Sequence, residues 1–437
     1  MSNANTSNLD GSWRRLIGGS SVVLVLKLLG ALGGFLFSLW VAREHGDAAL
    51  GRAELFILWV TVGATLLRGG WDGAVVKAFG SWSSAGRKDW IRDGFQKWTG
   101  VFLGVALATA LVVPRILSWA SVDSPSVWLG VAMGAWVIVG WLAECLRGTG
   151  HVATYALFQP GWWMLFAGLW MGLGATDPTS ALGYSSVLMV GMALLFTVWW
   201  FRFRYAPKAA GGVDDTPRPN EAMVRLAAPI WMGGVLHLVL SWADTAMLSF
   251  WMTDADVAHY RAAFRLAALL TFTQFAVNAL GAPTFGALHA AGDTEGLRKT
   301  VHRIGWMNAA VAVPGLLVLL GLGPWLLGLW GASFAESDAV AALGILAVGQ
   351  AINALSGPVM YLLNMTGGER VGLAILALSA ACQLTAGVVW VPEYGLLGAA
   401  ASACFGMVVW NIVSLIWVRK TYGFWMVSLM NGWWRRN

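Results

Sequence analysis

The chain has 437 residues, of which 58% are hydrophobic and only 11% are charged, and its mean hydropathy is +0.65. An ordinary soluble domain carries about 25% charged residues, so this composition excludes a soluble globule and predicts an integral membrane protein. The net charge of +6 does not point to nucleic acid, because the basic residues are spread over short loops without a recognised nucleic-acid module.

Apolar segments long enough to cross a bilayer recur from one end of the chain to the other, since a spanning helix needs about 20 apolar residues. The spans are expected at 17–41, 52–76, 98–120, 126–146, 153–174, 181–201, 226–252, 260–287, 304–323, 339–363, 371–391 and 395–418. The predicted fold class is therefore an all-α integral membrane protein with twelve transmembrane helices. The stretch before the first span lacks the features of a signal peptide, so the first helix is expected to remain in the mature protein.

The tryptophan and cysteine residues give little indication of a binding or metal site. Many of the 28 Trp lie near expected span ends, which favours anchoring at the membrane interface over sugar stacking. The three cysteines, Cys145, Cys382 and Cys404, are scattered without metal-ligand spacing. We expect no metal site, no disulfide framework and no cofactor.

The Lys and Arg of the loops predict the orientation. With a cytoplasmic N-terminus, the opposite side holds only Arg43, Arg52, Arg115 and Arg261, and most other loop cations face the cytoplasm. Both termini are therefore expected inside the cell. This asymmetry also favours an even number of spans.

The two halves of the chain resemble each other weakly. The stretch 49–53 matches 258–262 at the outer start of the second helix of each half, and a basic segment follows that helix in both halves. We expect six-helix bundles at residues 1–210 and 211–437, with a short cytoplasmic tail on the second. Because each half holds an even number of spans, the bundles should be related by a pseudo-two-fold axis along the membrane normal.

In the second half the sequence resembles polysaccharide exporters, which are lipid-linked oligosaccharide flippases of the multidrug/oligosaccharidyl-lipid/polysaccharide exporter (MOP) superfamily. The motifs that carry the resemblance are API (228–230), SWADTAML (241–248), HYRAAFRL (259–266), NALGAPTF (278–285), AGDTEGL (291–297), GQAIN (349–353), SGP (356–358), NMTGGE (364–369) and YGLLGAA (394–400). The first half adds AR at 42–43 and LRGTG at 146–150.

The resemblance implies two six-helix bundles that open alternately to each side of the cytoplasmic (inner) membrane. It further implies a flippase that moves an undecaprenyl-pyrophosphate-linked oligosaccharide for polysaccharide biosynthesis. The expected partners are the lipid-linked glycan, membrane lipid and possible glycan polymerases or glycosyltransferases. The oligomeric state, the glycan and the driving ion are left open.

Three cations lie within expected spans, namely Lys27, Arg68 and Arg265. Ionisable groups in spans cost about 2.5–3.5 kcal/mol each near a helix centre, and they usually face a protein interior or an aqueous cavity. One hypothesis is a cationic cavity that neutralises a pyrophosphate; the alternative is snorkelling or pairing. The acidic Asp72 and Glu144 lie near cytoplasmic ends and are expected to be solvated.

Polar residues in the second half extend this hypothesis. Asp244 and Arg265 are expected at similar depth on antiparallel helices, where they would form an ion pair or a gate. Two alternatives, contact with sugar and hydrogen bonding between helices, are open for the amide side chains of Gln274, Asn278, Gln350 and Asn353.

Competing functions make different demands on the sequence. A multidrug or small-solute exporter for cations would be expected to place carboxylates in its cavity, whereas the first span offers Lys27 and no acid. A glycan polymerase or ligase would need a large outer loop with catalytic residues, and the outer loops are short. The sequence therefore predicts a transporter and not an enzyme.

The topology yields the first prediction. In a variant whose native cysteines are replaced by serine, a cysteine introduced at Gly211 should not react with an impermeant thiol reagent in intact cells, because the basic 202–225 loop is expected in the cytoplasm. The same residue should react after permeabilisation. Labelling of intact cells would reverse the orientation.

Overall fold

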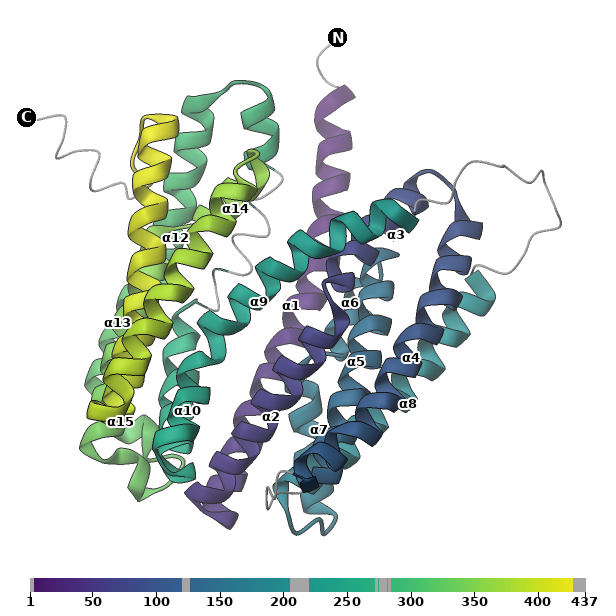
Figure 1. Ribbon diagram of the computed structural model, residues 1–437. Coiled ribbons are helices and arrows are strands. Elements are labelled where there is room, and N and C mark those ends of the chain that lie inside the picture. Colours follow the sequence, from purple (N-terminus) through teal and green to yellow (C-terminus); the bar gives the residue numbers. More distant parts are fainter. Residues whose placement is uncertain are drawn as a thin grey trace, which may run out of the picture. The chain divides into compact units, whose positions relative to one another are not determined.

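The computed structural model describes residues 4–119, 126–204, 220–271, 274, 281 and 284–426 (Figure 1). These residues form helices joined by short turns, with no strand among them. They cluster into two compact units: unit 1 is Met1–Trp40 with Phe56–Val235, and unit 2 is Val41–Leu55 with Leu236–Asn437. The expected division at 210–211 falls in the segment 205–219, outside the described residues.

Unit 1 is built around one buried helix. Its helices are α1 (Ala4–His45), α2 (Asp47–Arg68), α3 (Trp71–Ser84), α4 (Lys88–Trp119), α5 (Ser126–Gly148), α6 (Val152–Leu157), α7 (Pro160–Gly172), α8 (Pro178–Arg204) and the first part of α9 (Asn220–Trp251). Helix α5 packs against α3, α4, α6 and α8. In the most apolar stretch of α5, 72% of the residues are buried, whereas the corresponding share in α4 is 17%. Helix α5 therefore lies at the centre of unit 1 and α4 at its periphery.

Unit 2 has a corresponding central helix. It contains the turn between α1 and α2, the rest of α9, α10 (Asp254–Ala268), the 3₁₀ turn η1 (Leu269–Thr271), α12 (Thr294–Leu327), the 3₁₀ turn η2 (Ala332–Ala335), α13 (Ser337–Ser356), α14 (Val359–Met365) and α15 (Glu369–Tyr422). Helix α13 packs against α10, α12 and α15 (Figure 1). Residues 41–55 thus belong to unit 2, although both helices that they join continue into unit 1.

The expected spans fall on helical parts of the described chain, which confirms an all-α membrane protein, and of the span expected at 260–287 only residues 260–271, 274, 281 and 284–287 are described. Eight helices of the described chain are long and apolar enough to cross a bilayer. One of them, the 54-residue α15, holds the two spans expected at 371–391 and 395–418, because non-helical backbone at Gly395 (φ 53°, ψ −124°) divides it. That positive φ is accessible to glycine without steric cost, and Pro392 lies just before the kink.

The span expected at 52–76 is interrupted. It is divided into α2 and α3 at Gly69 and Gly70, both with positive φ. A Cβ on Gly70 would collide with the carbonyl oxygen of Ala227, so the break also allows close approach of α9 within unit 1. Similar breaks separate α6 from α7 before Pro160, and α13 from α14 at Gly357 and Pro358. Helix breaks leave backbone polar groups that must be satisfied locally, and the polar side chains of both units gather beside them.

The chain beyond α15 folds back onto unit 2. Phe424 and Met426 are buried in an apolar cluster with residues of α12 and α14, among them Val301 and Leu363. The ring of His302 hydrogen-bonds the carbonyl oxygen of Trp425 at 2.8 Å. This segment therefore supports α14 from the side of the cluster.

Glycines bring α1 and α7 together in unit 1. A Cβ on Gly161 would collide with the carbonyl group of Gly30, and a Cβ on Gly33 would lie 2.7 Å from the Cβ of Leu165. Close backbone approach through small residues is a main source of helix association in membranes, where lipid tails remove most of the hydrophobic driving force.

The second prediction follows from this contact. Gly161→Val should lower the thermal unfolding temperature of the detergent-purified protein, because the side chain must separate α1 from α7. Gly191→Val on α8 is the matched control, since no atom lies within 4 Å of the position of its Cβ. Equal unfolding temperatures for the two variants would contradict the close packing of α1 and α7.

Candidate functional site

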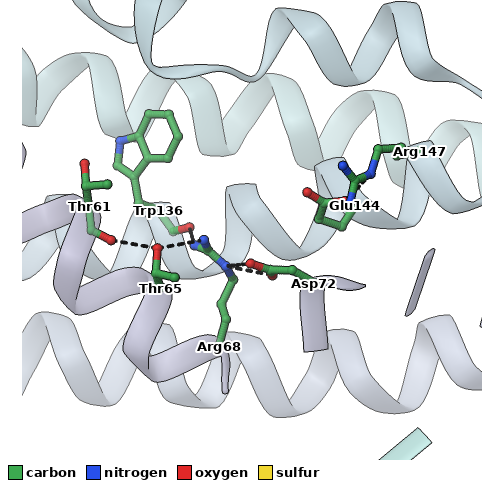
Figure 2. A network of polar contacts seen from close by, with 7 residues as sticks. All are labelled: Thr61, Thr65, Arg68, Asp72, Trp136, Glu144 and Arg147. Carbon is green, nitrogen blue, oxygen red and sulfur yellow. Dashed lines mark hydrogen bonds and ion pairs between the residues drawn. The ribbon is translucent and has the colours of Figure 1, made fainter. Parts of the chain in front are cut away.

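A network of charged and polar groups surrounds Arg68 at the end of α2 in unit 1 (Figure 2). Its Nε donates to both carboxylate oxygens of Asp72, at 2.8 and 2.9 Å. Its Nη1 donates to the carbonyl oxygen of Trp136 at 2.8 Å, and its Nη2 to the hydroxyl of Thr65 at 3.3 Å. The break between α2 and α3 places Asp72 in the first turn of α3, where a carboxylate also suits the helix dipole.

The packing of α5 accommodates this arginine. A Cβ on Gly140 would lie 2.6 Å from Nη1 of Arg68, so only glycine leaves room for the guanidinium. One helical turn further, Glu144 lies 2.6 Å from Nε of Arg147, and the Glu144 side chain is 12% exposed. The expectation that Asp72 and Glu144 are simply solvated is wrong, because each carboxylate is largely buried against an arginine. Glu144 and Gln159 line the same cavity of about 170 Å³ as Arg68.

The structure gives the surroundings of two of the three predicted cations, Arg68 and Lys27. Arg68 has a bidentate carboxylate partner, in agreement with the pairing alternative. Lys27 is exposed on α1. A single cationic cavity that spans both halves stays a prediction, because Lys27 and Arg68 belong to unit 1 and Arg265 to unit 2.

In unit 2 a single carboxylate is held between two arginines. Glu54, at the start of α2, is 1% exposed. It accepts from Nη2 of Arg265 at 2.5 Å and from Nε of Arg261 at 3.3 Å. The two arginines are one turn apart on α10, so both guanidinium groups reach the same point.

The expected ion pair between Asp244 and Arg265 is not formed. Asp244 accepts instead from the hydroxyl of Tyr260 at 2.5 Å and from the backbone N–H of Thr245 at 2.6 Å. Tyr260 and Arg265 are five residues apart on α10, which turns their side chains about 140° away from each other. Similar depth on antiparallel helices is therefore not enough to pair Asp244 with Arg265. The partner of Asp244 depends on which face of α10 each residue occupies.

Arg261 is further enclosed by aromatic rings. Its guanidinium carbon lies 4.0 Å from the ring centroid of Trp242 and 4.9 Å from that of Phe264. Cation–π contacts of this kind stabilise a desolvated guanidinium. Phe264 continues from this cluster into the wall of a cavity.

That cavity, of about 340 Å³, brings together most of the predicted amides of the second half. Gln274, Gln350 and Asn353 all line it, and Asn278 lies outside the described residues. The remaining polar or aromatic lining residues include His237, Ser241, Phe264, Thr271, Tyr361, Trp410 and Asn411. No charged side chain occurs among the lining residues that the structure describes.

The amides also connect the walls of this cavity to each other. Gln274 donates to the carbonyl oxygen of Asn353 at 3.0 Å, and Asn411 donates to the side-chain oxygen of Asn353 at 3.3 Å. The alternatives of sugar contact and helix joining are therefore compatible here: the same groups connect helices and face a cavity beside the break at Gly357 and Pro358.

Sequence reasoning missed Glu54 and did not predict the burial of Arg261. Arg261 was counted as an outer-loop cation, although its side chain is only 9% exposed. A signal was present for Glu54, because it falls inside the span expected at 52–76 and a carboxylate there requires a partner. Tyr260 and Trp242 lie in the motifs HYRAAFRL and SWADTAML that carry the family resemblance.

Comparison with solved structures identifies the fold. An inward-facing multidrug resistance MATE family transporter of the MOP superfamily matches 92% of this chain and 98% of its own, with a TM-score of 0.72 and 15% identity. A MOP superfamily transporter from Pyrococcus furiosus matches 93% of this chain and 95% of its own (TM-score 0.64, 14% identity). A variant of the Vibrio cholerae MATE transporter VcmN matches 93% and 97% (TM-score 0.64, 16% identity).

Sequence comparison adds one curated relative. The probable flippase AglR of Haloferax volcanii is 23% identical over 272 residues, which are 62% of this chain and 56% of the relative. No family model matches the chain. The chain thus has the fold of MOP-superfamily exporters, which agrees with the family resemblance of its motifs, and the proteins that it resembles are transporters or flippases and not enzymes.

The third prediction tests the pairing of Arg68. Asp72→Asn should lower the free energy of unfolding by about 1–3 kcal/mol, since it removes a charged hydrogen-bond partner from a mostly buried guanidinium. The control is Glu295→Gln, which breaks the exposed pair with Arg298 and should cost less than Asp72→Asn, because water screens an exposed pair. Reversible unfolding in mixed micelles measures both. Equal losses would contradict a buried, structurally required pair.

Proposed function

We propose that this protein is an alternating-access flippase that moves an undecaprenyl-pyrophosphate-linked oligosaccharide across the cytoplasmic membrane. The observation that carries the proposal is the uncharged, amide-lined cavity of unit 2. Amide groups both donate and accept hydrogen bonds, as sugar hydroxyls do, and the rings of Trp410 and Tyr361 add apolar surfaces suited to sugar faces.

The comparisons support this proposal at two levels. The fold of MOP-superfamily exporters supports transport through a membrane, and the probable flippase from Haloferax volcanii supports a flippase activity. The exposed Lys27 in an apolar helix supplies a cation that suits a phosphate group. Placement of both termini in the cytoplasm follows from the loop charges.

A multidrug or small-solute exporter is the second candidate, favoured by the fold shared with a multidrug resistance transporter. Cationic drugs require negative charge where they bind. The described lining of the unit 2 cavity contains no carboxylate, and Glu54 and Asp72 are already engaged by arginines. These observations favour the glycan lipid over a cationic drug.

The fourth prediction concerns the cavity. In proteoliposomes, Gln350→Leu should reduce the initial rate of lipid-linked oligosaccharide flipping about tenfold, because one buried hydrogen bond to the substrate is lost while a partner stays desolvated. The lower rate should result from a weaker apparent affinity for the lipid-linked oligosaccharide, and the unfolding temperature of the variant should equal that of the wild type.

The matched control is Gln383→Leu, which removes another buried amide of unit 2 that is absent from the cavity lining and donates to the carbonyl oxygen of Leu240. This variant should retain its affinity for the substrate. Wild-type flipping by Gln350→Leu would remove the cavity from the transport path, and failure of the wild type to flip any glycan lipid would refute the proposed function.

A further inference from the structure

The arrangement around Glu54 has the form of an occupied anion site. Two guanidinium groups, from Arg261 and Arg265, converge on the two oxygens of one carboxylate, and that carboxylate is 1% exposed. Guanidinium forks of this kind bind phosphate oxygens as well as carboxylates, since both present oxygens at similar spacing. Counted by themselves, one Glu and two Arg leave one positive charge over, and the carboxylate of Asp244 lies close enough to Arg261 to interact with it electrostatically.

The anion in this cluster comes from a part of the chain that is distant in sequence from α10. Glu54 lies in the segment 41–55, and α2 continues from Phe56 into unit 1. The segment contacts unit 2 at further points: His259 hydrogen-bonds Asp47 at 3.1 Å, and Arg43 donates to the carbonyl oxygen of Leu329 at 2.7 Å. Separation of this segment from α10 would therefore carry Glu54 away from the arginines.

The cluster also adjoins the amide-lined cavity. The ring of Phe264 contacts the guanidinium of Arg261 on one side and lines the cavity on the other. An anionic group at the arginines and a sugar in the cavity would thus be neighbours across a single aromatic side chain. This is the order of groups in a glycan attached through a diphosphate.

We infer that Arg261 and Arg265 form a diphosphate-binding site and that Glu54 occupies it as an internal substitute when no substrate is bound. Release of the 41–55 segment exposes the two arginines to the diphosphate, and departure of the diphosphate lets Glu54 return. An anion thus accompanies the two buried arginines at both stages, which lowers the cost of holding their charge in the membrane. This inference rests on the proposed function for its ligand, a prenyl diphosphate sugar.

The fifth prediction uses inorganic pyrophosphate as the probe. The full-length protein in detergent at low ionic strength is titrated calorimetrically, because salt screens such contacts. Glu54→Gln should bind pyrophosphate about tenfold more tightly than the wild type, since the competing carboxylate is gone. Adding Arg265→Gln should abolish the gain. Glu54→Asp, which keeps the charge on a shorter side chain, should give a smaller gain and serves if Glu54→Gln fails to fold.

The matched control is Asp47→Asn, which removes a carboxylate from the same segment but leaves Arg261 and Arg265 engaged, and its affinity should equal that of the wild type. Unchanged affinity in both Glu54 variants, or a gain that survives Arg265→Gln, would overturn the inference. Titration with inorganic phosphate and with phosphatidylglycerol vesicles separates the possible sources of the anion. A gain equal for phosphate and pyrophosphate, or confined to the vesicles, would overturn the diphosphate assignment.

Flipping by the wild type, measured in parallel, keeps the two proposals distinct. Wild-type flipping without any pyrophosphate gain in Glu54→Gln refutes the anion site alone. A pyrophosphate gain without flipping of any glycan lipid refutes the proposed function and supports the anion site.

Discussion

An ion inside apolar helices must find an opposite charge or several hydrogen bonds, because hydrocarbon offers neither. This requirement organises both units. It joins the end of α2 to the start of α3 through Arg68 and Asp72, and it holds the start of α2 against α10 through Glu54 and two arginines. The break between α2 and α3 and the glycine at position 140 of α5 serve the same requirement, since the first places Asp72 beside the guanidinium of Arg68 and the second leaves room for it.

The two units pair their buried charges in different ways. In unit 1 the charged groups pair locally, within a few residues along the chain, and their network is closed by the carbonyl oxygen of Trp136. In unit 2 the partner of the arginines is about 200 residues away in sequence. A local pair fixes the geometry within one part of the chain, whereas a remote pair fixes one segment against another.

Much of the architecture could be predicted from the sequence, because the period and length of apolar segments reflect the thickness of the bilayer. Positions of the spans and the all-α class followed from this. The partners of individual charges did not. The pairing of Arg265 with Glu54 in place of Asp244 depends on which face of α10 each residue occupies, and predicted span ends do not fix that rotation. The amides Gln274, Gln350 and Asn353 were identified by residue type, yet their meeting in one cavity depends on the packing of α13 and on the break at Gly357.

The segment that follows α15 gives the far end of the polypeptide an influence on the cavity. Val359 and Met360 line the cavity, and both also belong to or pack against the apolar cluster that contains Phe424 and Met426. One wall of the cavity is therefore supported on its far side by Phe424 and Met426. Substitutions at Phe424 or Met426 can thus alter the shape of the cavity, although neither residue is among those that line it.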